Sequence, residues 1–162
     1  MKFQKDIILF INTNIIDKIK KCVDDLYPNE TFGLILGPRP NQIPQEDPDA
    51  YQYHYIGEIF ECVEPSEQSP VSFFMDNTEE LFRILEKAKN KYNRRVLSIF
   101  HSHPSGAYPS GFDRDYMKFL DNSYSKIYKN QIWTIMDASN KDLNGFIYLY
   151  DELMQITIEI RE

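Results

Sequence analysis

The stretch His101-Ser102-His103-Pro104, followed by Pro109-Ser110-Gly111-Phe112-Asp113, carries the most structural information in this chain. The apolar segment before it, residues 95–100, predicts a strand that leads straight into the first histidine. Side chains two residues apart in an extended segment point the same way, so both imidazole rings can face one point. Pro104 then ends the strand pairing and turns the chain.

These residues form a plausible metal-binding set. Zinc binds neutral imidazole nitrogens and carboxylate oxygens, and a catalytic zinc keeps three protein ligands and one open position for water. His101, His103 and Asp113 would supply the three ligands, because a tight turn through Gly106 lets the start of the next helix reach back toward the strand end. Ser110 is a natural N-cap for that helix, although its hydroxyl could instead point at a substrate oxygen.

Bulk composition indicates one soluble globular domain over residues 1–162, with 42% hydrophobic residues. Its apolar runs are too short to cross a bilayer, and the N-terminus lacks the pattern of a secretory signal. We therefore expect a cytoplasmic protein with no membrane partner.

Cys22 and Cys62 are too few for a disulfide framework, so reduced thiols are expected. A formal net charge of −7 argues against a nucleic-acid partner.

Periodicity and turn residues predict an α/β fold (α+β mixed) with a central mixed β-sheet flanked by helices. Asn77 and Glu80 resemble a capping box at the start of the second helix. Residues 38–50, which contain four prolines, and residues 64–70 are expected to be loops. Strands are predicted over residues 6–11, 32–36, 51–63, 71–75, 95–100, 131–136, 146–150 and 155–160, and helices over 14–26, after 77, and over 113–120.

A zinc hydrolase also needs a group that takes a proton from water and passes it to the leaving amine. The candidate is Glu30, in the segment Pro28-Asn29-Glu30-Thr31-Phe32-Gly33-Leu34-Ile35-Leu36-Gly37, just before a buried strand. Local sequence logic does not bring Glu30 near His101. A family resemblance does.

The upstream glutamate segment, the His-Ser-His-Pro stretch and the Pro-Ser-x-x-Asp stretch together resemble the JAMM (MPN-plus) zinc metallopeptidases of the prokaryotic JAB type. The resemblance implies an MPN fold, which is similar to that of cytidine deaminases, with one Zn²⁺ per chain. It matches His101, His103 and Asp113 to the zinc ligands and Glu30 to the general acid and base. Ser110 matches the serine that helps hold the oxyanion. The segment between His103 and Ser110 is one residue shorter than the common family pattern.

The resemblance also implies a function. Family members cleave the isopeptide or peptide bond after the C-terminal tail of a ubiquitin-like modifier, so the expected partners are such a modifier or its conjugates. Compact prokaryotic members often accompany modifier-activating and conjugating enzymes. Two alternatives stay open: a catalytically inactive MPN-type binding scaffold, and a zinc amidohydrolase acting on small substrates.

Several other residues have simpler interpretations. Asp115 is a rival to Asp113, but its spacing from Ser110 predicts a place on the helix surface. His54 stands alone in a tyrosine-rich segment, where ordinary packing or surface exposure is favoured over metal binding. Neither cysteine has the spacing that a zinc-dependent nucleoside deaminase requires.

Overall fold

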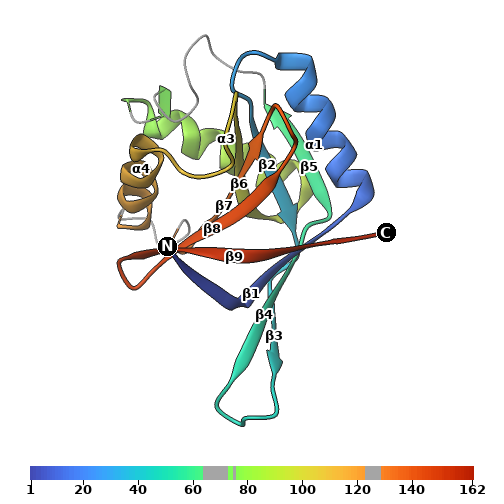
Figure 1. The fold of residues 1–162 in the computed structure, drawn as a ribbon, viewed down its shortest axis with the longest axis vertical. Helices are drawn as coiled ribbons and strands as arrows, with labels where there is room; N and C mark the ends of the chain where they lie inside the picture. Colours follow the sequence, from blue (N-terminus) through green and yellow to red (C-terminus); the bar gives the residue numbers. More distant parts are fainter. Residues whose placement is uncertain (64–72, 75, 123–128) are drawn as a thin grey trace.

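The computed structural model describes residues 1–63, 73–74, 76–122 and 129–162 (Figure 1). The helices are α1 (Thr13–Leu26), α3 (Thr78–Tyr92) and α4 (Gly111–Asp121). The strands are β1 (Lys2–Asn12), β2 (Phe32–Gly37), β3 (Asn41–Pro44), β4 (Tyr51–Ile56), β5 (Ile59–Val63), β6 (Arg95–His103), β7 (Ile132–Asp137), β8 (Leu143–Leu149) and β9 (Glu152–Arg161).

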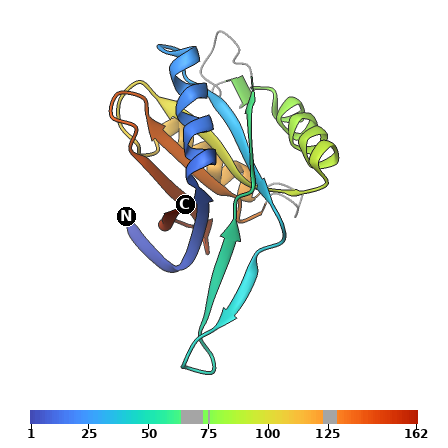
Figure 2. The same ribbon diagram turned by 90° about the vertical axis from the view of Figure 1, so that its right-hand side faces the viewer.

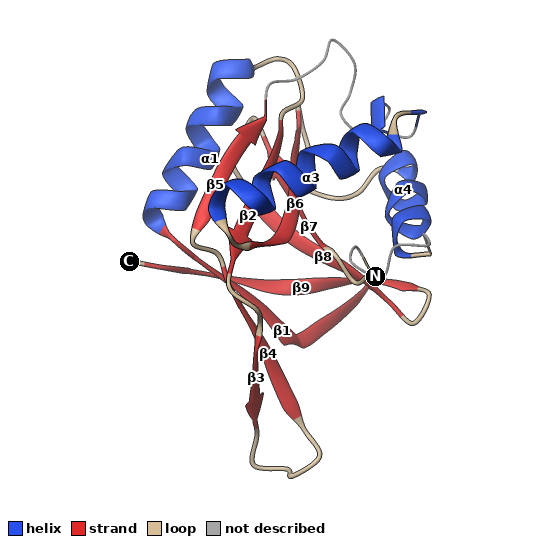
Figure 3. Ribbon diagram, turned by 180° about the vertical axis from the view of Figure 1, so that it is seen from behind, coloured by secondary structure: helices blue, strands red, loops and turns tan. Residues whose placement is uncertain are grey.

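The nine strands formed by the described residues belong to one sheet with the order β3-β4-β1-β9-β8-β7-β6-β2-β5. The sheet is mixed, because β1 pairs in parallel with β4 and β9, β6 pairs in parallel with β7, and the other neighbours are antiparallel. It curls strongly between its two ends (Figure 3). The predicted mixed sheet with flanking helices is confirmed.

Helices cover both faces of the sheet, with α1 on one side and α3 on the other (Figure 2). The alternation of strand side chains divides the core accordingly. Ile35 of β2 packs in the cluster that contains the buried face of α1. Its neighbours Leu34 and Leu36 point the other way, into the cluster formed with α3 and α4. The β2–β6 pair is therefore buried from both sides.

The first helix forms as predicted. Its N-cap is Asn12, whose side-chain oxygen accepts a hydrogen bond from the backbone N–H of Ile15 at 2.9 Å. Ile15, Ile16, Ile19 and Val23 are buried on one face. The helix ends at Leu26, before the proline that disfavours further helix at the preceding residue.

Two predictions in the N-terminal half are wrong. Residues 51–63 form two strands and not one, because the chain breaks at Gly57, whose backbone N–H donates to the Phe10 carbonyl at 2.8 Å. A Cβ at Gly57 would lie 2.8 Å from side-chain atoms of both Ile11 and Ile35, so only glycine fits at this close approach. The loop predicted over 38–50 contains the short edge strand β3, which pairs with β4 in a hairpin that projects from the body (Figures 1 and 2).

The region before α3 also differs from its prediction. Phe73 and Phe74 are helical, whereas a strand was expected over 71–75; residues 71, 72 and 75 and the loop predicted over 64–70 lie outside the described residues. A short apolar run cannot be assigned to strand or helix by periodicity alone. Asn77 is the N-cap of α3, but there is no capping box: its side-chain amide donates to the Phe73 carbonyl at 2.9 Å.

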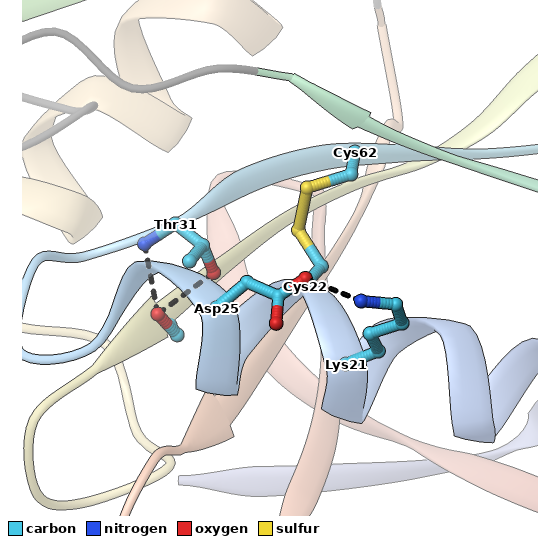
Figure 4. Close-up of a disulfide and its surroundings, with 6 residues drawn as sticks. Lys21, Cys22, Asp25, Thr31 and Cys62 are labelled. Atoms are coloured by element: carbon cyan, nitrogen blue, oxygen red, sulfur yellow. Dashed lines mark hydrogen bonds and ion pairs between the residues drawn. A yellow bond between two sulfur atoms is a disulfide. The ribbon is translucent and has the colours of Figure 1, made fainter.

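The expectation of reduced cysteines is contradicted. Cys22 of α1 and Cys62 of β5 form a disulfide, with their Cα atoms 6.0 Å apart (Figure 4). The two residues are separated by 40 positions, and only the packing of α1 beside β5 brings them together. Cysteine number and spacing carry no trace of that packing, which is why the sequence did not reveal the pair.

No helix in the described parts of the chain is long and apolar enough to cross a membrane.

Candidate metal centre

The two histidines lie at the carboxyl end of β6, which runs on to His103. Ile99 belongs to the core beneath α3 and α4, and His101 and His103 follow it on the same face of the strand. His101 is buried and His103 is mostly buried. Their Nε2 atoms lie 3.2 Å apart, so both rings direct the same nitrogen toward one point, as the sequence predicted.

Asp113 reaches that point from α4. Its Oδ2 lies 3.2 Å from His101 Nε2 and 3.0 Å from His103 Nε2. The carboxylate is held there by a capping box at the start of the helix: the backbone N–H of Ser110 donates to Asp113 Oδ2 at 2.9 Å, and the backbone N–H of Asp113 donates to Ser110 Oγ at 3.1 Å. The same bonds therefore begin α4 and aim the carboxylate.

This group is suited to hold a metal ion. One donor atom from each of the three residues lies within 4.8 Å of the others. Two ligand atoms about 2.0–2.1 Å from a tetrahedral ion lie about 3.3 Å from each other, close to the separations seen here. Two nitrogens and one oxygen make a ligand set typical of catalytic zinc, and a fourth position is left for water or substrate.

The ionisation of the group favours a charged carboxylate. Burial alone would raise the pKa of Asp113, but hydrogen bonds from His101, His103 and the Ser110 backbone outweigh it, and the pKa lies well below its ordinary value. Burial lowers the pKa of His103, but the hydrogen bond and charge of Asp113, together with the charge of Glu30, outweigh it and raise the pKa. Without metal, the site therefore pairs a carboxylate with an imidazole that gains a proton readily.

Glu30 reaches this centre through the pairing of β2 with β6. Phe32 lies opposite His101 in the antiparallel register, so the residues before β2 run alongside the residues that follow His101. Thr31 is fully buried, and its backbone N–H and its hydroxyl both donate to Ser102 Oγ, at 2.9 and 2.8 Å. The carboxylate of Glu30 consequently lies close enough to His103 to affect its pKa.

Ser110 occupies the N-cap position, as one of its two predicted roles requires. Its oxygen accepts from the Asp113 backbone through a lone pair, so the hydroxyl proton is not used by the cap. The residue is exposed beside the buried carboxylate. Capping the helix and donating to a substrate oxygen are therefore compatible roles for this one side chain.

Asp137, at the end of β7, supports the turn after the histidines and was not predicted. Its Oδ2 accepts from the backbone N–H of Gly106 at 2.8 Å, and its Oδ1 accepts from the backbone N–H of Ser139 at 2.8 Å. Gly106 has φ +90°, a conformation that favours glycine. Hydrogen bonds from Ser139, Gly106 and Asn140 lower the pKa of Asp137 to about 2. The sequence after the predicted strand has a recognisable turn signal, Asp137-Ala138-Ser139-Asn140. Nothing in that signal predicts the hydrogen bond between Asp137 and Gly106.

The rival residues lie elsewhere. Asp115 is exposed on α4 and does not belong to the metal-binding group. His54 is on β4, where its ring packs against Phe10 with centroids 4.8 Å apart and its Nε2 lies 3.2 Å from Gln52 Oε1. A cavity of about 440 Å³ opens at the opposite end of β6, beside Arg95, and none of the candidate site residues lines it.

Comparison with known proteins identifies the family. The family described as prokaryotic homologs of the JAB domain matches residues 13–142, which include all five candidate residues. A comparison with curated proteins found no match.

Solved structures share the fold. The solution structure of a Desulfitobacterium hafniense protein is 22% identical, with a TM-score of 0.66 over 96% of this chain and 93% of that one. A Salinibacter ruber protein is 20% identical, with a TM-score of 0.55 over 100% and 92%. The crystal structure of a JAB1/MPN domain protein from Archaeoglobus fulgidus is 13% identical, with a TM-score of 0.50 over the whole of both chains.

Proposed function

The chain belongs to the family of prokaryotic homologs of the JAB domain, and on that premise we propose that it is a zinc-dependent isopeptidase or peptidase. Its substrate is the C-terminal tail of a ubiquitin-like modifier, and it cuts the bond that follows the tail. The observation that carries the proposal is the convergence of His101 Nε2, His103 Nε2 and Asp113 Oδ2 within 3.0–3.2 Å of one another. A scaffold that only binds a partner does not need the three metal ligands, so their presence favours an enzyme over a scaffold.

The three ligands would hold Zn²⁺, which when bound polarises a scissile carbonyl and lowers the pKa of a water molecule. Glu30 accepts the proton of the attacking water and delivers it to the leaving amine. The hydroxyl of Ser110 donates a hydrogen bond to the oxygen on which negative charge develops. Asp113 stays ionised throughout, since its pKa lies well below the neutral range.

The sheet offers an edge for the substrate tail. β5 is an end strand of the sheet and pairs with β2, with Val63 opposite Phe32. The carboxyl end of β5 therefore lies at the same end of β2 as Glu30. A flexible tail ending in glycine can add to this edge as an extra strand, with main-chain hydrogen bonds providing the grip and small residues favoured near the cut. Modifier-activating and conjugating enzymes would be the functional neighbours of such an activity.

The proposal is tested by mass spectrometry of candidate modifiers after incubation with the protein and zinc, with a chelator control. The substrates are a linear modifier fusion, a lysine-linked conjugate and a set of short acyl-amino-acid amides. Release of the mature modifier that stops with chelator supports the proposal. Turnover of the short amides alone would instead make the protein a small-substrate amidohydrolase. Binding of the modifier with no cleavage in the presence of zinc would make it a scaffold.

A further inference from the structure

Within the described parts of the chain, only two buried side-chain polar atoms have no hydrogen-bond partner: His101 Nδ1 and the hydroxyl oxygen of Tyr116. A buried polar group that makes no hydrogen bond destabilises the folded protein, so native proteins rarely tolerate one. Both residues line the same cavity, together with Phe32, Phe74, Leu81, Ile99 and Trp133. Because the two residues whose polar atoms lack a hydrogen bond line one cavity, a single partner inside that cavity can serve both.

The cavity has the size of a single solvent molecule. Its volume is about 10 Å³, close to the smallest space that holds one water. Trp133 forms one wall, with its ring 6.4 Å from the His101 ring and 6.1 Å from the Tyr116 ring, centroid to centroid. The remaining lining is apolar, so any water there depends on the two orphaned atoms.

The donor and acceptor roles of these atoms fit a bridging water. His101 directs Nε2 toward the proposed metal, so its neutral ring carries the proton on Nδ1, which must donate. The hydroxyl of Thr78, which interacts with the Tyr116 phenol, donates its own proton to the Phe74 carbonyl at 3.0 Å, so toward the phenol it can only accept. A water can accept from the imidazole and donate to the phenol oxygen, which satisfies both.

We propose that Tyr116 is a positioning residue of the metal centre, acting through one buried water that links its hydroxyl to His101 Nδ1. Tyr116 follows Asp113 by three residues on α4, so one helix face carries both a ligand and the partner of a ligand. A metal-bound histidine is oriented and made more basic by the group that receives its other ring proton. The inference rests on the proposed zinc site, but it concerns a residue outside the family motifs.

The variant Tyr116→Phe removes the hydroxyl and keeps the ring. The matched control is Tyr148→Phe, which removes the hydroxyl of another buried tyrosine, one that donates to the Asp151 carbonyl at 3.1 Å. Zinc affinity is measured by competition with a chromophoric chelator for the wild type and both variants. We expect Tyr116→Phe to bind zinc about tenfold more weakly and Tyr148→Phe to match the wild type. Equal affinity in all three proteins, or an equal loss in both variants, would overturn the role of Tyr116.

A crystal structure of the wild type tests the water independently of zinc. We expect density for one water within about 3.2 Å of both His101 Nδ1 and the Tyr116 oxygen, and its loss or displacement in Tyr116→Phe. A dry cavity, or a direct bond between the two side chains, would overturn the bridge. If the wild type bound no zinc, the proposed function would fail, and the crystal structure would still decide whether the bridge exists.

Discussion

Thr31 and Ser102 are joined by three hydrogen bonds. Ser102 Oγ accepts from both the backbone N–H and the hydroxyl of Thr31, and the backbone N–H of Ser102 donates to the Thr31 carbonyl at 3.1 Å. Each of the two residues neighbours a candidate site residue, since Glu30 precedes Thr31 and Ser102 lies between the two histidines. Figure 4 draws two of these bonds at Thr31. The pair therefore fixes the proposed proton-transfer group relative to the proposed metal ligands.

The variant Ser102→Ala should uncouple Glu30 from the metal centre. It leaves two buried donors of Thr31 without an acceptor, which costs about 1–3 kcal/mol of unfolding free energy. A small misplacement of a catalytic group is costly, so we expect kcat to fall about 10–100-fold while zinc stays bound. The measurements are chemical denaturation, zinc content and steady-state cleavage.

Its matched control is Ser98→Ala, in the same strand. Ser98 is buried and its hydroxyl lies 3.0 Å from Thr134 Oγ1, on the β7 side rather than the β2 side. This variant should lose comparable stability and keep its cleavage rate. Similar rates in the two variants would show that the Thr31–Ser102 pair does not position Glu30.

A pair of variants separates the two roles of Ser110. Ser110→Gly costs only a few tenths of a kcal/mol as an N-cap, whereas Ser110→Ala costs about 1 kcal/mol. Both remove the hydroxyl proton, so we expect both to lower kcat about 10²–10³-fold and only the alanine variant to lower the melting temperature clearly. If the glycine variant cleaved at the wild-type rate, Ser110 would be a helix cap alone.

The metal-free site should give stability a distinctive pH dependence. The pKa of His103 is raised from 6.5, so its contribution is complete below that value and is lost as pH rises through the folded pKa. The pKa of Asp113 is lowered from 3.8, so its contribution is present above that value and is lost as pH falls. We expect chelator-treated protein to melt at a lower temperature at about pH 9 than at about pH 5, and a His103→Gln variant to show a smaller difference. A variant with an unchanged difference would assign the effect to other groups.

The Cys22–Cys62 disulfide closes a loop of 40 positions, and its removal should cost about 2–4 kcal/mol of unfolding free energy. The double variant Cys22→Ser/Cys62→Ser is compared with the wild type by urea denaturation, with and without a reducing agent. The reductant should destabilise the wild type to the level of the variant and leave the variant unchanged. A wild type that the reductant does not affect would contradict a stabilising disulfide.

The sequence pattern predicted features that depend on residues close together in the chain, and it missed features that depend on residues far apart. The pattern of residues 14–26 and the Asn12–Ile15 cap are local, and the sequence predicted the helix. The two histidines and Asp113 could be grouped because a strand end, a turn and a helix start are consecutive in the chain. The position of Glu30 depends on the pairing of β2 with β6 and on the adjoining bonds between Thr31 and Ser102, which are 71 positions apart, and only the family resemblance supplied it.

What the sequence could not reveal depends on packing between distant elements. The disulfide needs α1 against β5, and the Tyr116 cavity needs α4, β6 and β7 to meet around Trp133. The break at Gly57 follows from its close contact with Ile11 and Ile35, which lie on other strands. In each case the partners are set by the tertiary fold and leave no periodic or spacing signal.

The roles of the zinc ligands and of Glu30 are tested together by a paired measurement on the wild type and Glu30→Gln: zinc content by elemental analysis, and cleavage of a modifier fusion. We expect one zinc per chain in both proteins and a cleavage rate at least about 10²-fold lower in the variant, since the amide cannot transfer the proton. A variant that holds zinc and cleaves as fast as the wild type would contradict the role of Glu30, and a wild type that binds no zinc would contradict the zinc site.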